Sequence, residues 1–271
     1  MASIVLRHWI TGAAIVALMH LPSAPAAQTR PFVYSLLPTA PTARANRLYA
    51  DLGYGHDLFQ GLGPESFEQR VGLLVPLGSA LTLVAEAGWA PHDDATRSDA
   101  SFRGELLAQL PIRGRAIVAL GAGAMRDYSR TPVALGRLVF GYAWPHTQTA
   151  ANLRIEHPFR SDAGAERRDP VDVIMTLGLS HVVTGSLRLG FESVAEDLEG
   201  LVESDETEGG AKLMVGPALG FAPPGAHWSA VVVAGPVLQL TSSAVNGTAS
   251  GAPRDLTNGG YVIRTSVTLQ W

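Results

Sequence analysis

Residues 259–271, Gly-Gly-Tyr-Val-Ile-Arg-Thr-Ser-Val-Thr-Leu-Gln-Trp, alternate between two kinds of side chain. In an extended chain, one face would carry Tyr261, Ile263, Thr265, Val267, Leu269 and Trp271. The opposite face would carry Val262, Arg264, Ser266, Thr268 and Gln270. Because successive side chains of a strand point to opposite faces, this period of two predicts a strand with one apolar and one polar side.

A terminal amphipathic strand that ends on Trp271 resembles the last strand of bacterial outer-membrane β-barrel proteins. The resemblance is to this broad class of Gram-negative proteins and not to a family with a known substrate. It implies a location in the cell outer membrane and contact with outer-membrane lipid and lipopolysaccharide. It also implies that the barrel-assembly machinery recognises the C-terminal strand.

The composition excludes several other classes of function. Charged residues make up only 16% of the 271 residues, whereas soluble domains carry about 25%. A net charge of -4 without a basic run argues against a nucleic-acid partner. The absence of cysteine excludes disulfides, thiolate metal sites and a cysteine nucleophile. No cofactor is expected.

The N-terminal residues 1–26 have the pattern of a secretory signal peptide. Arg7 and His8 precede an apolar run over residues 10–19, and residues 24–26 read Ala-Pro-Ala, so we expect cleavage near Ala26. The alternative, a membrane anchor, needs about 20 apolar residues, more than this run offers. Residues 27–46 are rich in Pro, Ala and Thr and are predicted to be an extended periplasmic lead-in.

Residues 47–271 are predicted to form a single antiparallel transmembrane β-barrel of about twelve strands. Clusters of Gly, Pro, Asn and Asp divide this part of the chain into segments of the length that a tilted strand needs to cross a bilayer. The expected strands are 47–55, 66–76, 80–91, 100–111, 115–125, 132–144, 147–157, 170–181, 186–196, 210–221, 227–240 and 259–271.

The connections between these segments alternate in length, as in bacterial barrels with short periplasmic turns and long external loops. The long connections are 56–65, 92–99, 126–131, 158–169, 197–209 and 241–258. The short ones are 77–79, 112–114, 145–146, 182–185 and 222–226. Tryptophans at strand ends predict aromatic girdles at the two membrane surfaces, formed by Trp89, Trp144, Trp228 and Trp271. Pro217 and Pro236 fall inside strands, where we expect two bulges.

The polar strand faces would line the barrel lumen. Their acidic residues are Asp51, Glu68, Glu86, Glu105, Glu156, Asp172 and Glu192, and their basic residues are Arg70, Arg103, Arg115, Arg137, Arg154, Arg188, Lys212 and Arg264. The two signs nearly balance. Two interpretations remain open: paired charges that fill the barrel, and charges that line a narrow pore and select solutes.

The loops and the strands offer no strong catalytic or metal-binding motif. Loop 197–209 is acidic and could bind divalent cations or simply be solvated. His56-Asp57 and His92-Asp93-Asp94 lack a metal-ligand spacing, so no metal is predicted. Ser180 and His181 are adjacent on a strand and would face opposite ways, and no Gly-x-Ser-x-Gly elbow is present. An enzyme is therefore not expected.

The favoured prediction is a narrow channel for small hydrophilic solutes. The alternative is a non-conducting structural or surface-interaction barrel with a salt-bridged lumen, and an outer-membrane hydrolase ranks third. Autotransporter translocators also end on an aromatic strand, but this lead-in is too short for a passenger and too rich in Pro for a helix. A soluble periplasmic β protein is the remaining alternative fold.

Overall fold

The computed structural model describes residues 30–38, 45–56, 65–91, 98–112, 114–126, 132–159, 171–202, 210–241, 256–257 and 259–271. The expected signal peptide, residues 1–26, lies outside these ranges, as do most residues of the long connections. His92-Asp93-Asp94 and the acidic residues after Val202 in loop 197–209 also lie outside them.

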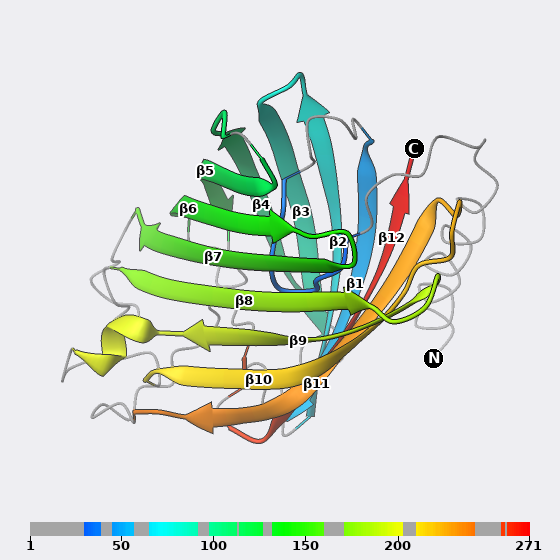
Figure 1. Ribbon diagram of the computed structural model, residues 1–271. Helices are drawn as coiled ribbons and strands as arrows, with labels where there is room; N and C mark the ends of the chain where they lie inside the picture. Colours follow the sequence, from blue (N-terminus) through cyan, green and yellow to red (C-terminus); the bar gives the residue numbers. More distant parts are fainter. Residues whose placement is uncertain are drawn as a thin grey trace, which may run out of the picture.

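Twelve strands and one short 3-10 helix make up the regular structure of the described residues (Figure 1). The strands are β1 (Arg47–His56), β2 (Glu65–Leu77), β3 (Leu81–Pro91), β4 (Ser98–Gln109), β5 (Ala116–Arg126), β6 (Pro132–Ala143), β7 (Thr147–Pro158), β8 (Asp172–Val182), β9 (Leu187–Glu196), β10 (Lys212–Phe221), β11 (Trp228–Gln239) and β12 (Tyr261–Gln270). The 3-10 helix η1 (Leu198–Leu201) follows β9. Each strand boundary lies within two residues of its prediction from the sequence.

The sheet closes on itself as an antiparallel barrel, which confirms the predicted fold class. Each strand pairs with its neighbours along the chain, and β1 completes the ring by pairing with β12, from Arg47 opposite Gln270 to Gly55 opposite Val262. Among the described residues, no helix has the length and apolarity needed to cross a membrane. Closure leaves no unpaired sheet edge, which is the condition for strands to lie in a bilayer.

The outer face of the barrel is apolar. Along the strands, large apolar side chains point outward and alternate with buried ones, including Leu52, Leu106, Leu120, Leu138, Phe140, Ile155, Leu189 and Leu219. Trp89, Trp144, Trp228 and Trp271 also lie on this outer face, near strand ends. Trp144 contacts Tyr142 and Trp228 contacts Phe221 in tilted ring pairs, with ring centroids 4.3 and 5.7 Å apart.

The two strand prolines do not produce the expected bulges. β10 and β11 keep one register on both sides of the prolines, with Met214 opposite Val237 and Ala218 opposite Val233. The pairing is instead interrupted between these two positions, where Pro217 and Pro236 offer no N–H to a partner strand. Both prolines still keep their register with the other neighbouring strand, Pro217 with β9 and Pro236 with β12.

Residues 30–38, which we name the strap, lie inside the barrel (Figure 1). The sequence interpretation assigned them to a lead-in on the periplasmic side. Phe32, Val33 and Leu36 of the strap are all at least 94% buried. The strap lies inside the barrel because these apolar side chains would lose the free energy of burial if they lay in water.

The apolar outer face predicts a strong penalty for a charge at its centre. Leu138→Arg, in the middle of β6, should lower the free energy of unfolding by about 2–4 kcal/mol, because arginine at the bilayer midplane is poorly solvated. Reversible urea unfolding in lipid vesicles measures this loss. The matched control is Leu81→Arg at the first residue of β3, which should cost about 0–1 kcal/mol. Equal losses for both variants would contradict a membrane-spanning orientation.

Candidate functional site in the barrel interior

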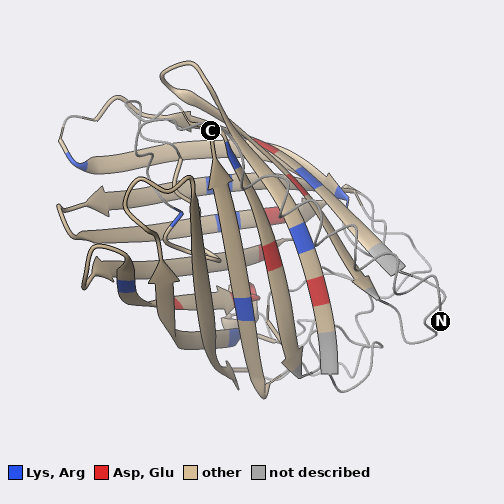
Figure 2. Ribbon diagram, turned by 90° about the vertical axis from the view of Figure 1, so that its right-hand side faces the viewer, with Lys and Arg blue, Asp and Glu red and all other residues tan. Residues whose placement is uncertain are grey.

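Charged side chains gather on the inner face of the barrel. Figure 2 shows acidic and basic bands on the same and on neighbouring strands. These groups are buried, so each needs a partner of opposite charge or several hydrogen bonds to offset its lost hydration. The alternation of side chains along each strand places them there, because the opposite face meets the apolar surroundings.

Glu68 on β2 binds two arginines at once. Its Oε1 accepts a hydrogen bond from Arg70 Nε at 2.8 Å, and its Oε2 accepts one from Arg264 Nη1 at 2.6 Å. Glu68 is 0% exposed and Arg264 1%. Arg264 comes from β12 on the far side of β1, so this carboxylate links the two ends of the barrel chain inside the ring.

Three further ion pairs lie on strands β3, β4, β6 and β7. Arg103 donates to Glu86 at 3.0 Å, and the Tyr49 hydroxyl donates to the same Glu86 oxygen at 2.7 Å. Arg137 pairs with Glu105 at 2.7 Å, and Arg154 pairs with Glu156 at 2.7 Å. Each guanidinium thus neutralises a carboxylate that the barrel wall removes from bulk water.

The remaining members of the expected lumen lining have other surroundings. Asp51 pairs with Arg30 of the strap, and Glu192 accepts hydrogen bonds from strap backbone. Lys212 lies 3.5 Å from Asp197, while Arg188 donates to Ser180 and Gln148. Asp172 is buried at the start of β8.

Arg115 does not lie in the interior. It is exposed in the turn before β5, because the strand begins one residue later than its expected start. A residue at the end of a strand is reached by water whichever face its side chain points to. Arg115 therefore needs no buried partner.

A small open space of about 20 Å³ lies among the charged residues of β2 to β7. Glu68, Arg70, Glu86, Arg103 and Arg154 line it, together with Ser101, Phe102 and Met125. Three arginines and two glutamates therefore surround this space. Each of the three arginines also has a carboxylate within 3.0 Å, so the local charge is largely balanced.

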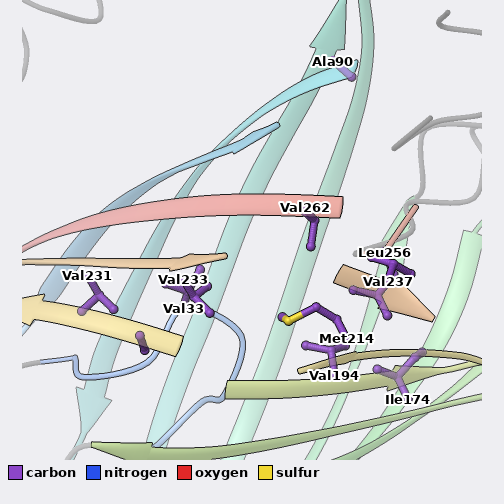
Figure 3. Close-up of a cluster of buried hydrophobic side chains, with 11 residues drawn as sticks. Val33, Ala90, Ile174, Val194, Met214, Val231, Val233, Val237, Leu256 and Val262 are labelled. Carbon is purple, nitrogen blue, oxygen red and sulfur yellow. The ribbon is translucent and has the colours of Figure 1, made fainter. Parts of the chain in front are cut away.

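The interior opposite this space contains an apolar cluster. A buried cluster there includes Val194, Met214, Val231, Val233 and Val262, mostly from β9 to β12, and Val33 of the strap belongs to it. Figure 3 shows Val33 beside Val233. The strap thus packs against apolar side chains on this side through Val33, and on the side of β1 to β4 through Leu36, which belongs to a second buried cluster.

Ser180 and His181 do not form a catalytic pair. Ser180 is buried and accepts a hydrogen bond from Arg188, whereas His181 is exposed and contacts Thr147 Oγ1 at 2.8 Å. In the part of the chain that the structure describes, no group of three His, Cys, Asp or Glu residues has a metal-binding arrangement.

The sequence interpretation missed the contribution of the strap. Arg30 and Ser35 enter the polar interior, and Asn152, which was not selected as a site residue, binds the strap backbone. One signal could have found the strap. Residues 32–37 read Phe-Val-Tyr-Ser-Leu-Leu, which is unusually apolar for a solvated linker.

Glu199 in η1 is a titratable group outside the strands. Its Oε2 accepts a hydrogen bond from the Val173 backbone N–H at 2.7 Å. Burial raises the pKa of Glu199 to about 7, and the nearby carboxylates of Asp197 and Asp172 act in the same direction, against the hydrogen bond. The carboxyl group therefore changes charge near neutral pH.

The barrel matches solved structures of outer-membrane porins. The NanC porin aligns with a TM-score of 0.54 at 9% identity, covering 83% of this chain and all of its own (100%). The KdgM porin aligns with a TM-score of 0.53 at 9% identity, covering 83% of this chain and 99% of its own. The chain has the fold of a bacterial outer-membrane β-barrel. A KdgM porin in complex with disordered oligogalacturonate aligns equally well, with a TM-score of 0.53 at 9% identity over 84% of this chain and 99% of its own. No protein-family model and no curated protein sequence matches this chain.

The double pairing of Glu68 predicts a large effect of its removal. Glu68→Ala should lower the free energy of unfolding by about 3–5 kcal/mol, because Arg264 would stay buried without this carboxylate. Urea unfolding of the refolded protein measures the change. Arg115→Ala, at an exposed turn, should change it by no more than about 0.5 kcal/mol. A loss below 1 kcal/mol for Glu68→Ala would contradict a structural role for this pair.

The raised pKa of Glu199 predicts a pH-dependent stability of η1. The folded helix holds this proton more tightly than the unfolded chain, so its stability should fall as the pH rises from about 4.5 to about 7 and stay level above. Hydrogen exchange of the amides in residues 198–202, corrected for intrinsic rates, measures this change. Glu199→Gln should remove the pH dependence. The same pH trend in both proteins would refute the assignment.

Proposed function

We propose that the protein is a channel of the outer membrane for small hydrophilic solutes. The observation that carries this proposal is the open, charged space inside the barrel, lined by Arg70, Arg103, Arg154, Glu68 and Glu86. A barrel that served only as a membrane anchor could fill its interior with apolar side chains at less cost in desolvation. Charged walls instead suit a path for hydrated solutes.

The outer face supports a location in the outer membrane. Its apolar side chains match the hydrocarbon layer, and Trp144, Trp228 and Trp271 lie where β6, β11 and β12 meet the short connections or the chain terminus. Amphipathic indole rings favour the membrane–water boundary. Outer-membrane lipid and lipopolysaccharide are therefore the proposed surroundings of the barrel.

The class of solute follows from the balance of charges. Three arginines and two glutamates around the open space give a weak preference for anions over cations. The KdgM porin, which shares the fold, has been solved in complex with oligogalacturonate, a sugar acid oligomer. That complex supports a hydrophilic solute for barrels of this shape, and we propose the same broad class here.

One observation favours a second candidate, a non-conducting barrel with structural or surface roles. The strap and the ion pairs of Glu68, Glu105 and Glu156 together fill much of the interior. Filling of this kind is expected of a barrel whose lumen is closed. Conductance measurements separate this candidate from the channel.

Ion selectivity tests the channel and the place of Arg154 in it. Arg154→Ala removes a positive charge from the open space and leaves Glu156 without this ion pair. The reversal potential in a salt gradient across a planar bilayer should therefore shift toward cation selectivity. Arg115→Ala is the matched control, because Arg115 is exposed at a turn and should leave the selectivity unchanged.

The measurement needs both the intact chain and a chain without residues 27–38. A folded and inserted protein that stays silent in both forms would refute the channel and support the non-conducting barrel. An unchanged reversal potential in a conducting Arg154→Ala variant would show that Arg154 does not lie on the solute path.

A further inference from the structure

The strap crosses the barrel from one wall to the opposite wall. Arg30 at its start donates to Asp51 on β1 and to Ser266 on β12, at 3.0 and 2.9 Å. Leu37 near its end packs against Gly141 on β6, and β6 lies opposite β12 in the closed order of strands. Between these ends the strap contacts β7, β8 and β9.

Glu192 on β9 binds the strap through its backbone. Its carboxylate accepts hydrogen bonds from three successive N–H groups, those of Val33 at 2.7 Å, Tyr34 at 2.8 Å and Ser35 at 3.2 Å. Glu192 is 0% exposed. These three donors take the place that an arginine has beside Glu68, Glu105 and Glu156, so this part of the wall is built for a ligand with peptide N–H groups.

Asn152 on β7 recognises the next residue of the strap. Its Oδ1 accepts the Leu36 N–H at 2.8 Å, and its Nδ2 donates to the Leu36 carbonyl oxygen at 3.0 Å. One side-chain amide thus satisfies both polar groups of one extended residue. Arg137 Nη1 donates to the same Oδ1 at 3.5 Å, which holds the amide in this orientation.

The barrel wall also leaves room for the strap side chains. The Phe32 ring lies over Gly178 on β8, where an added Cβ would come within 2.5 Å of the ring. The guanidinium of Arg30 lies over the Tyr49 ring, 3.9 Å from its centroid. The Phe32 ring therefore fits only because residue 178 is a glycine.

The strap is not part of the sheet. Within the described ranges, no backbone–backbone hydrogen bond joins residues 30–38 to a strand, and the ring of strand pairings is complete without them. A segment that adds no strand to the ring and is held by contacts with side chains of the wall can leave its site without breaking the barrel.

We infer that Glu192 and Asn152 form a binding site for an extended peptide backbone, and that residues 30–38 of the same chain occupy it as a removable plug. One consequence of this inference rests on the proposed channel: departure of the strap should widen the solute path. Binding of the peptide itself does not depend on conduction.

A chain without residues 27–38 separates the two claims. In planar bilayers it should conduct several-fold more than the intact chain, and a synthetic peptide of residues 27–38 should bind it and restore the lower conductance. Equal conductance of the intact and shortened chains would refute the removable plug but not the proposed channel. Silence of both forms, with the peptide still bound, would refute the channel and keep the binding site.

Two controls test whether the backbone is what the site recognises. The same peptide, N-methylated at Tyr34 and Ser35, keeps every side chain but loses two donors to Glu192, and it should not bind measurably. In the shortened barrel, Glu192→Gln should weaken binding of the normal peptide about tenfold or more, because one of the two acceptor oxygens becomes an NH2 group that cannot accept a backbone N–H. Arg115→Ala is the matched variant and should leave binding unchanged. Equal binding of both peptides would overturn the site.

A second variant covers the case in which the shortened chain does not fold. Gly178→Ala in the intact chain places a methyl group against the Phe32 ring and should displace the strap. Its conductance should rise above that of the intact chain. Gly104→Ala is the control, because an added Cβ there meets no atom within 4 Å. Equal conductance of these two variants would argue against the plug.

Discussion

The pairing of β1 with β12 is the constraint on which the rest of the structure depends. Without it, two strands would expose unpaired N–H and C=O groups, and each such group costs several kcal/mol in hydrocarbon. Closure fixes the inner and outer faces of every strand at once. The apolar residues then face the surroundings, and the charged residues are confined to a space with little water.

The burial of many charged groups determines which contacts the interior must provide. Carboxylates such as Glu68 and Glu105 are fully buried and are matched by arginines that lie two strands away. Glu192 has the same need for compensation, and it is met by three backbone N–H groups of the strap. The same physical requirement therefore produces both the ion-pair network and the site that holds residues 30–38.

Apolar and charged contacts share the interior. On β9 to β12 a buried apolar cluster, into which Val33 packs, lies beside the charged Glu192 and Arg264. On β2 to β7 the ion pairs leave a small open space. In the channel that we propose, the solute path lies on the side of this open space, and departure of the strap widens it.

Local pattern in the sequence determined the strands, their boundaries within two residues and the outward or inward direction of most side chains. A period of two and the turn residues between segments are local properties, so no tertiary information was needed. The same pattern placed Glu68 and Arg264 on inner faces, but not at 2.6 Å from each other, because the ring must close before β12 lies beside β1. Tertiary structure also decided the position of the strap. Its contacts with Asp51, Asn152 and Glu192 join residues far apart in the chain, and only the closed barrel brings these three onto one enclosed surface.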